Sequence, residues 1–407
     1  MKTGNIRTED DPICLAPFVG LFSAPARMSP CCEMVHDGYK DLDEMWNSDL
    51  MKGLRKSFIN GDTENIPNYC KDCLKSPTSH RDYYYLPDRS YYKETFEKYK
   101  HSVLEDGTMT ETPISYLAIG VSNKCNLACR ICYPGISSKR QSIAESIGEI
   151  SVKELLPSLV DEKYEADNEL DYEKLLIEHS DTLDEVVIHG GDPTQHKDLP
   201  FLLDLLEKHL KPDCKISFLS NGTFRKCIDG EVIWDKLRRF KNLHVVFSMD
   251  STKEVNEYSR TGLKHDRLVK LIWEAKEAIP HAYIGCHATL NNMTVVRFAE
   301  FLAYYEKEFF DRGVWLSCNV VNGPKEYSPC NLPVKLRAQV MMDLHKLKFD
   351  HWHMEEMRQW AIKAVTLQPF DQHLWNKFLV KEQKMDKLVG DDMFAVLPEF
   401  KEYQCIM

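Results

Sequence analysis

Short apolar runs rich in β-branched residues alternate with longer helical patterns from Ile114 onward. This alternation is typical of βα units that build a parallel sheet. Six runs predict strands near residues 114–120, 185–189, 215–219, 243–249, 283–289 and 314–320. Because right-handed crossovers bring the carboxyl ends of parallel strands to one edge, we expect a site in the loops that follow these strands.

The spacing of the predicted strands indicates how this α/β chain is divided into regions. Most gaps between strands are about thirty residues, the length of one βα repeat, but the first gap is longer. It contains an acidic stretch at 161–178, which we expect to form one or two surface helices. We therefore expect a cysteine-rich region at 1–110, a βα region at 111–328 and a helical carboxyl-terminal region at 329–407.

Composition narrows the class of protein. The 407 residues carry a formal net charge of −11, which argues against general nucleic-acid binding, because phosphate contacts draw on clustered Lys and Arg. The chain has no run of about eighteen apolar residues and no apolar amino-terminal signal region. We expect a soluble, cytoplasmic protein without membrane association. For its fourteen cysteines, metal ligation is a better explanation than a disulfide framework.

Cys125, Cys129 and Cys132 follow the first predicted strand, with three and then two residues between them. Three thiolates hold three irons of a [4Fe-4S] cluster and leave the fourth iron open to a ligand. The ligand suggested here is S-adenosylmethionine, whose carbon–sulfur bond breaks when a reduced cluster passes it one electron. The alternatives are a structural zinc site, which usually takes four ligands in two short pairs, or three buried thiols.

This triplet, framed by Ala118-Ile119-Gly120 and Asn126-Leu127, resembles the radical SAM superfamily, and more closely the twitch domain-containing radical SAM proteins. The resemblance implies that region 111–328 is a partial (β/α)6 barrel. It also implies that Ile131, between the second and third cysteines, contacts the adenine of S-adenosylmethionine.

Two segments after predicted strands resemble cofactor-binding motifs of the same family. Gly190-Gly191-Asp192-Pro193 is similar to a Gly-Gly-Glu-Pro motif that binds the amino group of S-adenosylmethionine, with Asp192 in place of Glu. Ser220-Asn221 is similar to a segment that lines the floor of the site. The alternatives are an ordinary Gly-Gly turn and a plain β-turn.

Ser248 and Asp250, at the end of the fourth predicted strand, resemble a family segment that meets the ribose and carboxylate of S-adenosylmethionine. Two polar side chains two residues apart point the same way from an extended chain and can bracket a diol. Arg260 falls in a further family-like segment and could pair with the methionyl carboxylate through its fork of donors. A helix cap and a solvent-facing arginine are the alternatives.

Five cysteines precede the predicted barrel: Cys14, the Cys31-Cys32 pair, Cys70 and Cys73. Their order resembles the auxiliary-cluster module called SPASM or twitch. The resemblance implies a second [4Fe-4S] cluster held by four of them, and we prefer Cys32 from the pair. A zinc site has the same ligand set and stays an alternative.

Cys286 and Cys318 fall in the fifth and sixth predicted strands, where we expect them to pack in the core. The alternative is a thiol that faces the barrel interior and donates a hydrogen atom or proton to a substrate radical.

Together these features predict a radical SAM enzyme, an oxidoreductase or peptide-modifying enzyme. We expect it to cleave S-adenosylmethionine reductively and to abstract a hydrogen atom from a peptide or protein side chain. A small metabolite or nucleotide is the alternative substrate, and a non-catalytic metal-binding scaffold is the alternative function. The expected electron donor is a flavodoxin or ferredoxin.

Overall fold

The computed structural model describes residues 14–24, 27–37, 39, 41–75, 89–149, 170–321 and 323–404. The predicted acidic helices at 161–178 therefore lie partly outside the described residues. Helix α8 (Tyr172–His179) occupies the end of that stretch. Within the described residues no helix is both long and apolar enough to cross a lipid bilayer.

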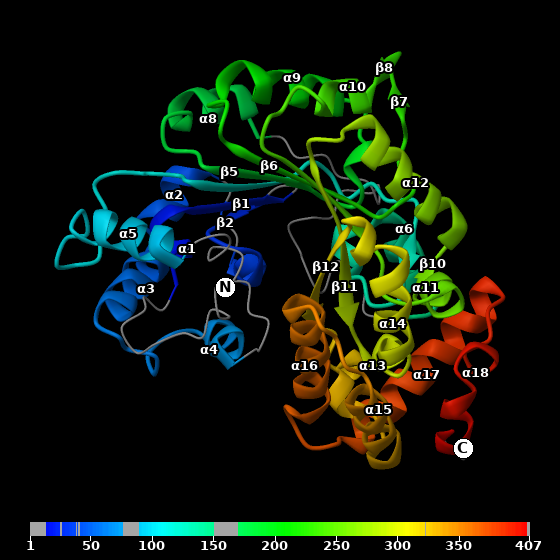
Figure 1. Cartoon of the computed structure of the whole chain (residues 1–407). Helices are drawn as coiled ribbons and strands as arrows, with labels where there is room; N and C mark the ends of the chain where they lie inside the picture. Colours follow the sequence, from blue (N-terminus) through cyan, green and yellow to red (C-terminus); the bar gives the residue numbers. More distant parts are fainter. Residues whose placement is uncertain are drawn as a thin grey trace.

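An eight-stranded sheet forms the centre of the molecule, in the order β12-β11-β9-β6-β5-β3-β1-β2 (Figure 1). All six predicted strands are confirmed, each within two residues of its predicted bounds. They are β3 (Tyr116–Gly120), β5 (Glu185–His189), β6 (Lys215–Ser220), β9 (Leu243–Ser248), β11 (Tyr283–Leu290) and β12 (Trp315–Val320). Neighbouring strands in this set pair in parallel, which confirms the predicted α/β class.

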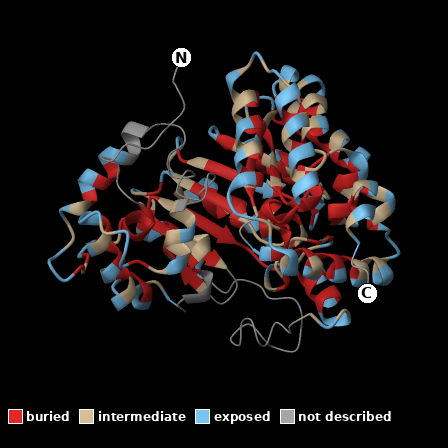
Figure 2. Cartoon of the chain, turned by 90° about the horizontal axis from the view of Figure 1, so that it is seen from below, coloured by how far each residue is buried: buried red, intermediate tan, exposed pale blue. Residues whose placement is uncertain are grey.

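Helices cover the outer face of the sheet, and buried residues fill the layer between them (Figures 1 and 2). Strand β9 shows why, because its residues alternate strictly between buried and half-buried and so give the strand one apolar face. The helices between the strands are α6 (Ser138–Ser146), α8, α9 (Leu199–His209), α10 (Ile233–Leu237), α11 (Lys253–Ser259), α12 (His265–Ala278), α13 (Asn292–Val295) and α14 (Phe298–Glu308).

The amino-terminal region joins the same sheet. Strand β1 (Gly20–Ala24) pairs in parallel with β3, with Gly20 opposite Tyr116, and β2 (Arg27–Ser29) adds an antiparallel edge strand. The region's helices are α1 (Ala16–Val19), α2 (Leu42–Trp46), α3 (Asp49–Ile59), α4 (Asn68–Lys75) and α5 (Arg89–Lys100).

The carboxyl-terminal region is helical, as its sequence predicts. Its helices are α15 (Val334–Lys346), α16 (Trp352–Thr366), α17 (Gln372–Val389) and α18 (Met393–Val396). Helix α17 is well delimited: the Asp371 carboxylate accepts from the backbone N–H groups of His373 and Leu374, and Gly390 ends it in the left-handed conformation.

Candidate functional site

The three cysteines of the predicted cluster motif lie in one loop after β3, at the carboxyl edge of the sheet. The backbone N–H of Cys125 donates to the Ser138 hydroxyl at 3.2 Å, which ties the start of the loop to α6. Further along, β4 (Ala128–Cys129) pairs with β10 (Arg260–Thr261), so that Cys129 lies opposite Arg260. The loop is thus fastened at both ends before Cys132 is reached.

Two polar side chains point at cysteine sulfurs in this loop. The amide of Asn221 donates to Cys125 Sγ at 3.4 Å, and Nη1 of Arg260 lies 3.8 Å from Cys129 Sγ. Burial raises the pKa of all three thiols, to about 11 for Cys129, while the positive charge of Arg260 opposes the rise at Cys129. Three thiols beside an amide N–H and a guanidinium suit an anionic iron–sulfur cluster.

Gly190 and Gly191 are required by the backbone of the cysteine loop. A Cβ on Gly190 would lie 2.5 Å from the Ser122 carbonyl oxygen, and one on Gly191 would lie 2.3 Å from the Lys124 carbonyl oxygen. The same carbonyls accept the N–H groups of Gly191 and Asp192 at 2.8 Å. The sequence predicts close approach by a ligand here, and the structure shows close approach by residues 122–124.

Asp192 is fully buried and holds two strand ends together. Its carboxylate accepts from the N–H and hydroxyl of Thr194 on its own side. It also accepts from the Ser220 hydroxyl at 2.9 Å, at the end of β6, and from the Asn221 N–H at 2.8 Å, just beyond it. Burial raises the pKa of Asp192, and these hydrogen bonds oppose the rise. Asp192 therefore supports the residue that reaches Cys125.

Asp250 and Arg260, predicted as separate cofactor contacts, form a buried ion pair with each other. Arg260 Nε lies 2.7 Å from Asp250 Oδ2, and Arg260 Nη2 donates to Asp250 Oδ1 at 2.9 Å. The backbone N–H of Thr289 also donates to Asp250 Oδ1. The pair connects the ends of β9 and β11 to the cysteine loop, through the approach of Arg260 to Cys129.

Ser248 ends β9 opposite His287 of β11, and His287 lies opposite Ser317 of β12. His287 Nδ1 and the Ser317 hydroxyl are 2.8 Å apart, so the three residues make a polar row across the concave face of the sheet. Ile131 is half-buried and packs against the main core.

Cys286 and Cys318 point the other way, as expected of core residues. Cys286 lies against Tyr305 of α14, and Cys318 Sγ is 3.3 Å from Met357 Sδ of α16. Both thiols are buried in the helical layer. They are therefore on the opposite face from His287 and Ser317.

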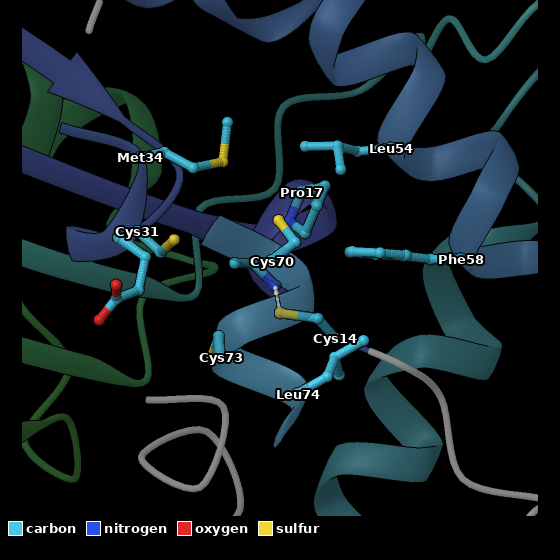
Figure 3. Close-up of a pocket in the computed structure, with 11 residues that line it drawn as sticks. Cys14, Pro17, Cys31, Met34, Leu54, Phe58, Cys70, Cys73 and Leu74 are labelled. Carbon is cyan, nitrogen blue, oxygen red and sulfur yellow. Dashed lines mark hydrogen bonds between the residues drawn. The ribbon is translucent and has the colours of Figure 1, made fainter. Parts of the chain in front are cut away.

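A second group of cysteines lines a pocket in the amino-terminal region (Figure 3). Cys14 precedes α1, Cys31 follows β2, and Cys70 and Cys73 lie on α4. The lining contains Cys31, whereas Cys32, the cysteine preferred from sequence, is outside it and begins a short 3-10 helix (Cys32–Asp37). Burial and the neighbouring Cys14 and Cys73 thiols raise the pKa of Cys31.

Apolar and cationic side chains support this pocket. Leu54 and Phe58 of α3 lie across it from Cys31 and Cys73 (Figure 3). Arg55, fully buried, donates to the carbonyl of Pro17 at 2.8 Å and lies over the Trp46 ring at 4.7 Å. Arg55 therefore holds the segment that follows Cys14. Within the part of the chain that the structure describes, no group of three or more His, Cys, Asp or Glu side chains is arranged to hold a single metal ion.

Sequence reasoning missed Arg130, which stands inside the cysteine motif. It is fully buried and pairs with Glu382 and Asp386 of α17. The signal was an arginine between two cysteines of a loop otherwise expected to face a cofactor, but the sequence did not show its partners, which lie far along the chain.

Comparison with known proteins found a family model and several solved structures that are similar to this chain. A model of the Radical SAM superfamily matches residues 119–302. Streptococcus suis SuiB bound to S-adenosylmethionine is 17% identical, with a TM-score of 0.40, over 72% of this chain and 58% of that chain. For anSMEcpe with bound AdoMet the identity is 19%, the TM-score 0.39 and the coverage 57% of each chain. For Escherichia coli coproporphyrinogen III oxidase (HemN) the identity is 17% and the TM-score is 0.33, over 62% of this chain and 52% of that chain.

The chain thus spans little more than half the length of these structures, and at such TM-scores the similarity does not extend to activity or substrate. No curated protein matches the chain.

Proposed function

We propose, from the match of residues 119–302 to the Radical SAM superfamily model, that this protein is a radical SAM enzyme with its cluster on Cys125, Cys129 and Cys132. The observation that carries the proposal is the loop itself, with three thiols at the carboxyl edge of a parallel sheet and N–H donors from Asn221 and Arg260 toward two of them. A bound [4Fe-4S] cluster with one open iron supplies the electron that cleaves S-adenosylmethionine to a 5'-deoxyadenosyl radical.

The residues of the chain have three roles in this proposal. The Asp250–Arg260 pair fixes the Cys129 side of the loop and places positive charge beside it. Asp192 fixes Asn221 against Cys125. The third role that we propose is contact with S-adenosylmethionine, by Ser248, by Ile131 and by the backbone at Gly190 and Gly191, with Ser220 supporting the floor of that site.

The test is anaerobic reconstitution with iron and sulfide, followed by reduction in the presence of S-adenosylmethionine. Replacing the three cysteines together by Ala should remove about four irons and abolish formation of 5'-deoxyadenosine. Cys227→Ala is the matched control, because Cys227 is exposed and lies in β7 (Cys227–Ile228), outside the loop. Cleavage by the triple variant at the control's rate would refute the assignment.

We also propose a second iron–sulfur cluster in the amino-terminal pocket, held by Cys14, Cys31, Cys70 and Cys73. The pocket lining supports Cys31 as the fourth ligand in place of Cys32. The matched pair Cys31→Ser and Cys32→Ser tests this: only the first should lose about four irons. Loss of iron in Cys32→Ser alone would return the choice to Cys32, and equal iron in the two variants would contradict the assignment of Cys31. Zinc at the site after purification without added metal would contradict the cluster.

The substrate class that we propose is a peptide or protein side chain, supported by the resemblance of the cysteine-rich segment to auxiliary modules. The probe is a perdeuterated cell extract separated into peptide and small-molecule fractions. Deuterium should appear in 5'-deoxyadenosine only with the peptide fraction and should disappear after protease digestion. Deuterium transfer from the small-molecule fraction would favour a metabolite or nucleotide instead.

A further inference from the structure

One buried guanidinium joins the cysteine loop to the carboxyl-terminal helices. Arg130 Nη1 lies 2.8 Å from Glu382 Oε2, and its Nη2 lies 2.8 Å from Asp386 Oδ1 and 2.7 Å from Asp391 Oδ2. Arg130 and Glu382 are fully buried, whereas the Asp391 side chain is 37% exposed. We call Glu382, Asp386 and Asp391 the acidic socket.

The rest of Arg130 is held equally closely. Its Nε donates to the Tyr258 carbonyl at 2.9 Å, its backbone N–H donates to the Ser259 carbonyl at 2.9 Å, and its guanidinium carbon lies 3.7 Å from the centre of the Tyr258 ring. The Tyr258 hydroxyl lies 3.0 Å from a carboxylate oxygen of Glu382 and 3.0 Å from one of Asp386, and its single proton is shared between these two acceptors. Helix α11 and helix α17 therefore enclose the side chain from two sides.

The position of Arg130 gives this contact its meaning. It immediately follows Cys129 and precedes Cys132 by two residues, so a fixed Arg130 backbone restricts both cysteines. Burial of a cation among three carboxylates is costly to arrange and costly to break, because removing the cation leaves buried like charges. Helices that only covered the surface of the sheet would not require such a buried ion pair.

We propose that Arg130 and the acidic socket form a clamp that positions the Cys129–Cys132 half of the loop, so that helix α17 is a working part of the cluster site. The proposal rests on the cluster assignment above for its purpose, but the clamp is a property of the metal-free chain. Arg130 is a positioning residue and does not itself touch cofactor or substrate.

Alkylation of the metal-free protein tests the clamp directly. Iodoacetamide labelling, followed by mass spectrometry of each cysteine peptide, should be about tenfold faster at Cys129 and Cys132 in Arg130→Met. Such a change corresponds to about 1.4 kcal/mol lost from the closed loop. Cys70 and Cys73 serve as internal references and should not change.

Arg358→Met is the matched control, because Arg358 is also a mostly buried arginine of the carboxyl-terminal helices and pairs with Glu355 within α16. It should leave labelling at Cys129 and Cys132 as in the unaltered protein. In reconstituted protein, chelator should remove iron about 10- to 100-fold faster from Arg130→Met than from the control, because loss of residues that orient metal ligands typically weakens metal affinity by that factor.

A graded series keeps the test decisive if Arg130→Met does not fold. Glu382→Gln, at the buried end of the socket, should release the loop more than Asp391→Asn at its exposed end. Unchanged labelling and iron release in Glu382→Gln would overturn the clamp. If the unaltered protein takes up no iron, the proposed function fails, while the labelling comparison still decides the clamp.

Discussion

At the scale of single residues, Asn221 contacts the sulfur of one proposed cluster ligand. Its amide donates to Cys125 Sγ, and its own backbone N–H is held by Asp192. Hydrogen bonds to cluster sulfurs stabilise the reduced, more negative state and so raise the reduction potential. Cys125 and Cys129 each have a side-chain N–H group beside the sulfur. The neighbour of Cys125 is the neutral amide of Asn221, and the neighbour of Cys129 is the cationic Arg260.

We predict that Asn221→Ala lowers the reduction potential of the cluster by about 40 mV. One hydrogen bond contributes about 1 kcal/mol, and 59 mV corresponds to about 1.4 kcal/mol for one electron. Redox titration followed by electron paramagnetic resonance measures the shift. Asn331→Ala is the control, since Asn331 donates to the Lys325 carbonyl away from the loop. A potential unchanged within error in Asn221→Ala would contradict the prediction.

His189 gives a pH dependence of stability. Its ring stacks on Phe22 at 4.7 Å, and its Nε2 has no hydrogen-bond partner among the residues described. Burial lowers the pKa of His189 to about 4. Between pH 6.5 and pH 4 the unfolded chain therefore binds the proton more readily than the folded one, so stability is retained above pH 6.5 and lost as pH falls.

We predict that His189→Leu flattens this loss by up to about 1.4 kcal/mol per pH unit in that window. Urea unfolding at several pH values measures it, and the difference between the two proteins isolates His189 from the other histidines. Parallel pH profiles for the two proteins would show that His189 is not the group responsible.

Residue types and spacings predicted which residues lie near the cysteine loop but few of the contacts among them. The sequence predicted that Asp250 and Arg260 both lie in the cofactor site, and in the structure they form an ion pair with each other. Motif resemblance assigns each residue to a ligand separately. In the folded chain, however, a buried charge is destabilising unless an opposite charge lies beside it. Arg260→Ala should therefore leave Asp250 buried without its cation.

At the scale of elements, Asp192 joins β5 to β6 through hydrogen bonds that cross two strand ends. We predict that Asp192→Ala lowers the free energy of unfolding by about 3 kcal/mol, because buried donors lose their acceptor. Asp198→Ala is the control: Asp198 is exposed, caps no N–H group, and should change stability by less than about 0.5 kcal/mol. Equal urea midpoints for the two variants would rule out this role.

Strand positions were predictable because alternation of apolar residues sets them locally. The face of each strand that the helices cover was harder to predict. Cys286 and His287 are neighbours on β11, and only the contact of Cys286 with Tyr305 shows that the thiol faces the helices and the imidazole the concave face. The period of two defines two faces without naming the covered one.

At the scale of the whole molecule, the amino-terminal region and the βα region share one sheet. Because β1 pairs with β3, removing residues 1–110 exposes the edge of β3 to solvent. We predict that a chain beginning at residue 111 aggregates and unfolds without cooperativity, as measured by size exclusion with light scattering and by circular dichroism. Co-expression of residues 1–110 should restore a soluble complex, and a monomeric 111–407 chain with a cooperative transition would contradict the prediction.

The sequence gives no sign of this shared sheet. Strand β1 is five residues long and stands more than ninety residues before its partner, with cysteine-rich segments between them. Short strands of this kind carry too little periodic signal to predict a pairing so distant in sequence.

The clamp between Arg130 and Glu382 joins residues 252 positions apart. At about 5 to 20 residues per second, a ribosome needs roughly 13 to 50 s to make the second after the first. During that interval the cysteines of the nascent chain have left the ribosome while their anchoring helix does not yet exist. We therefore expect stable iron loading to follow synthesis of helix α17, because the loop is held only after Glu382 has formed its ion pair with Arg130.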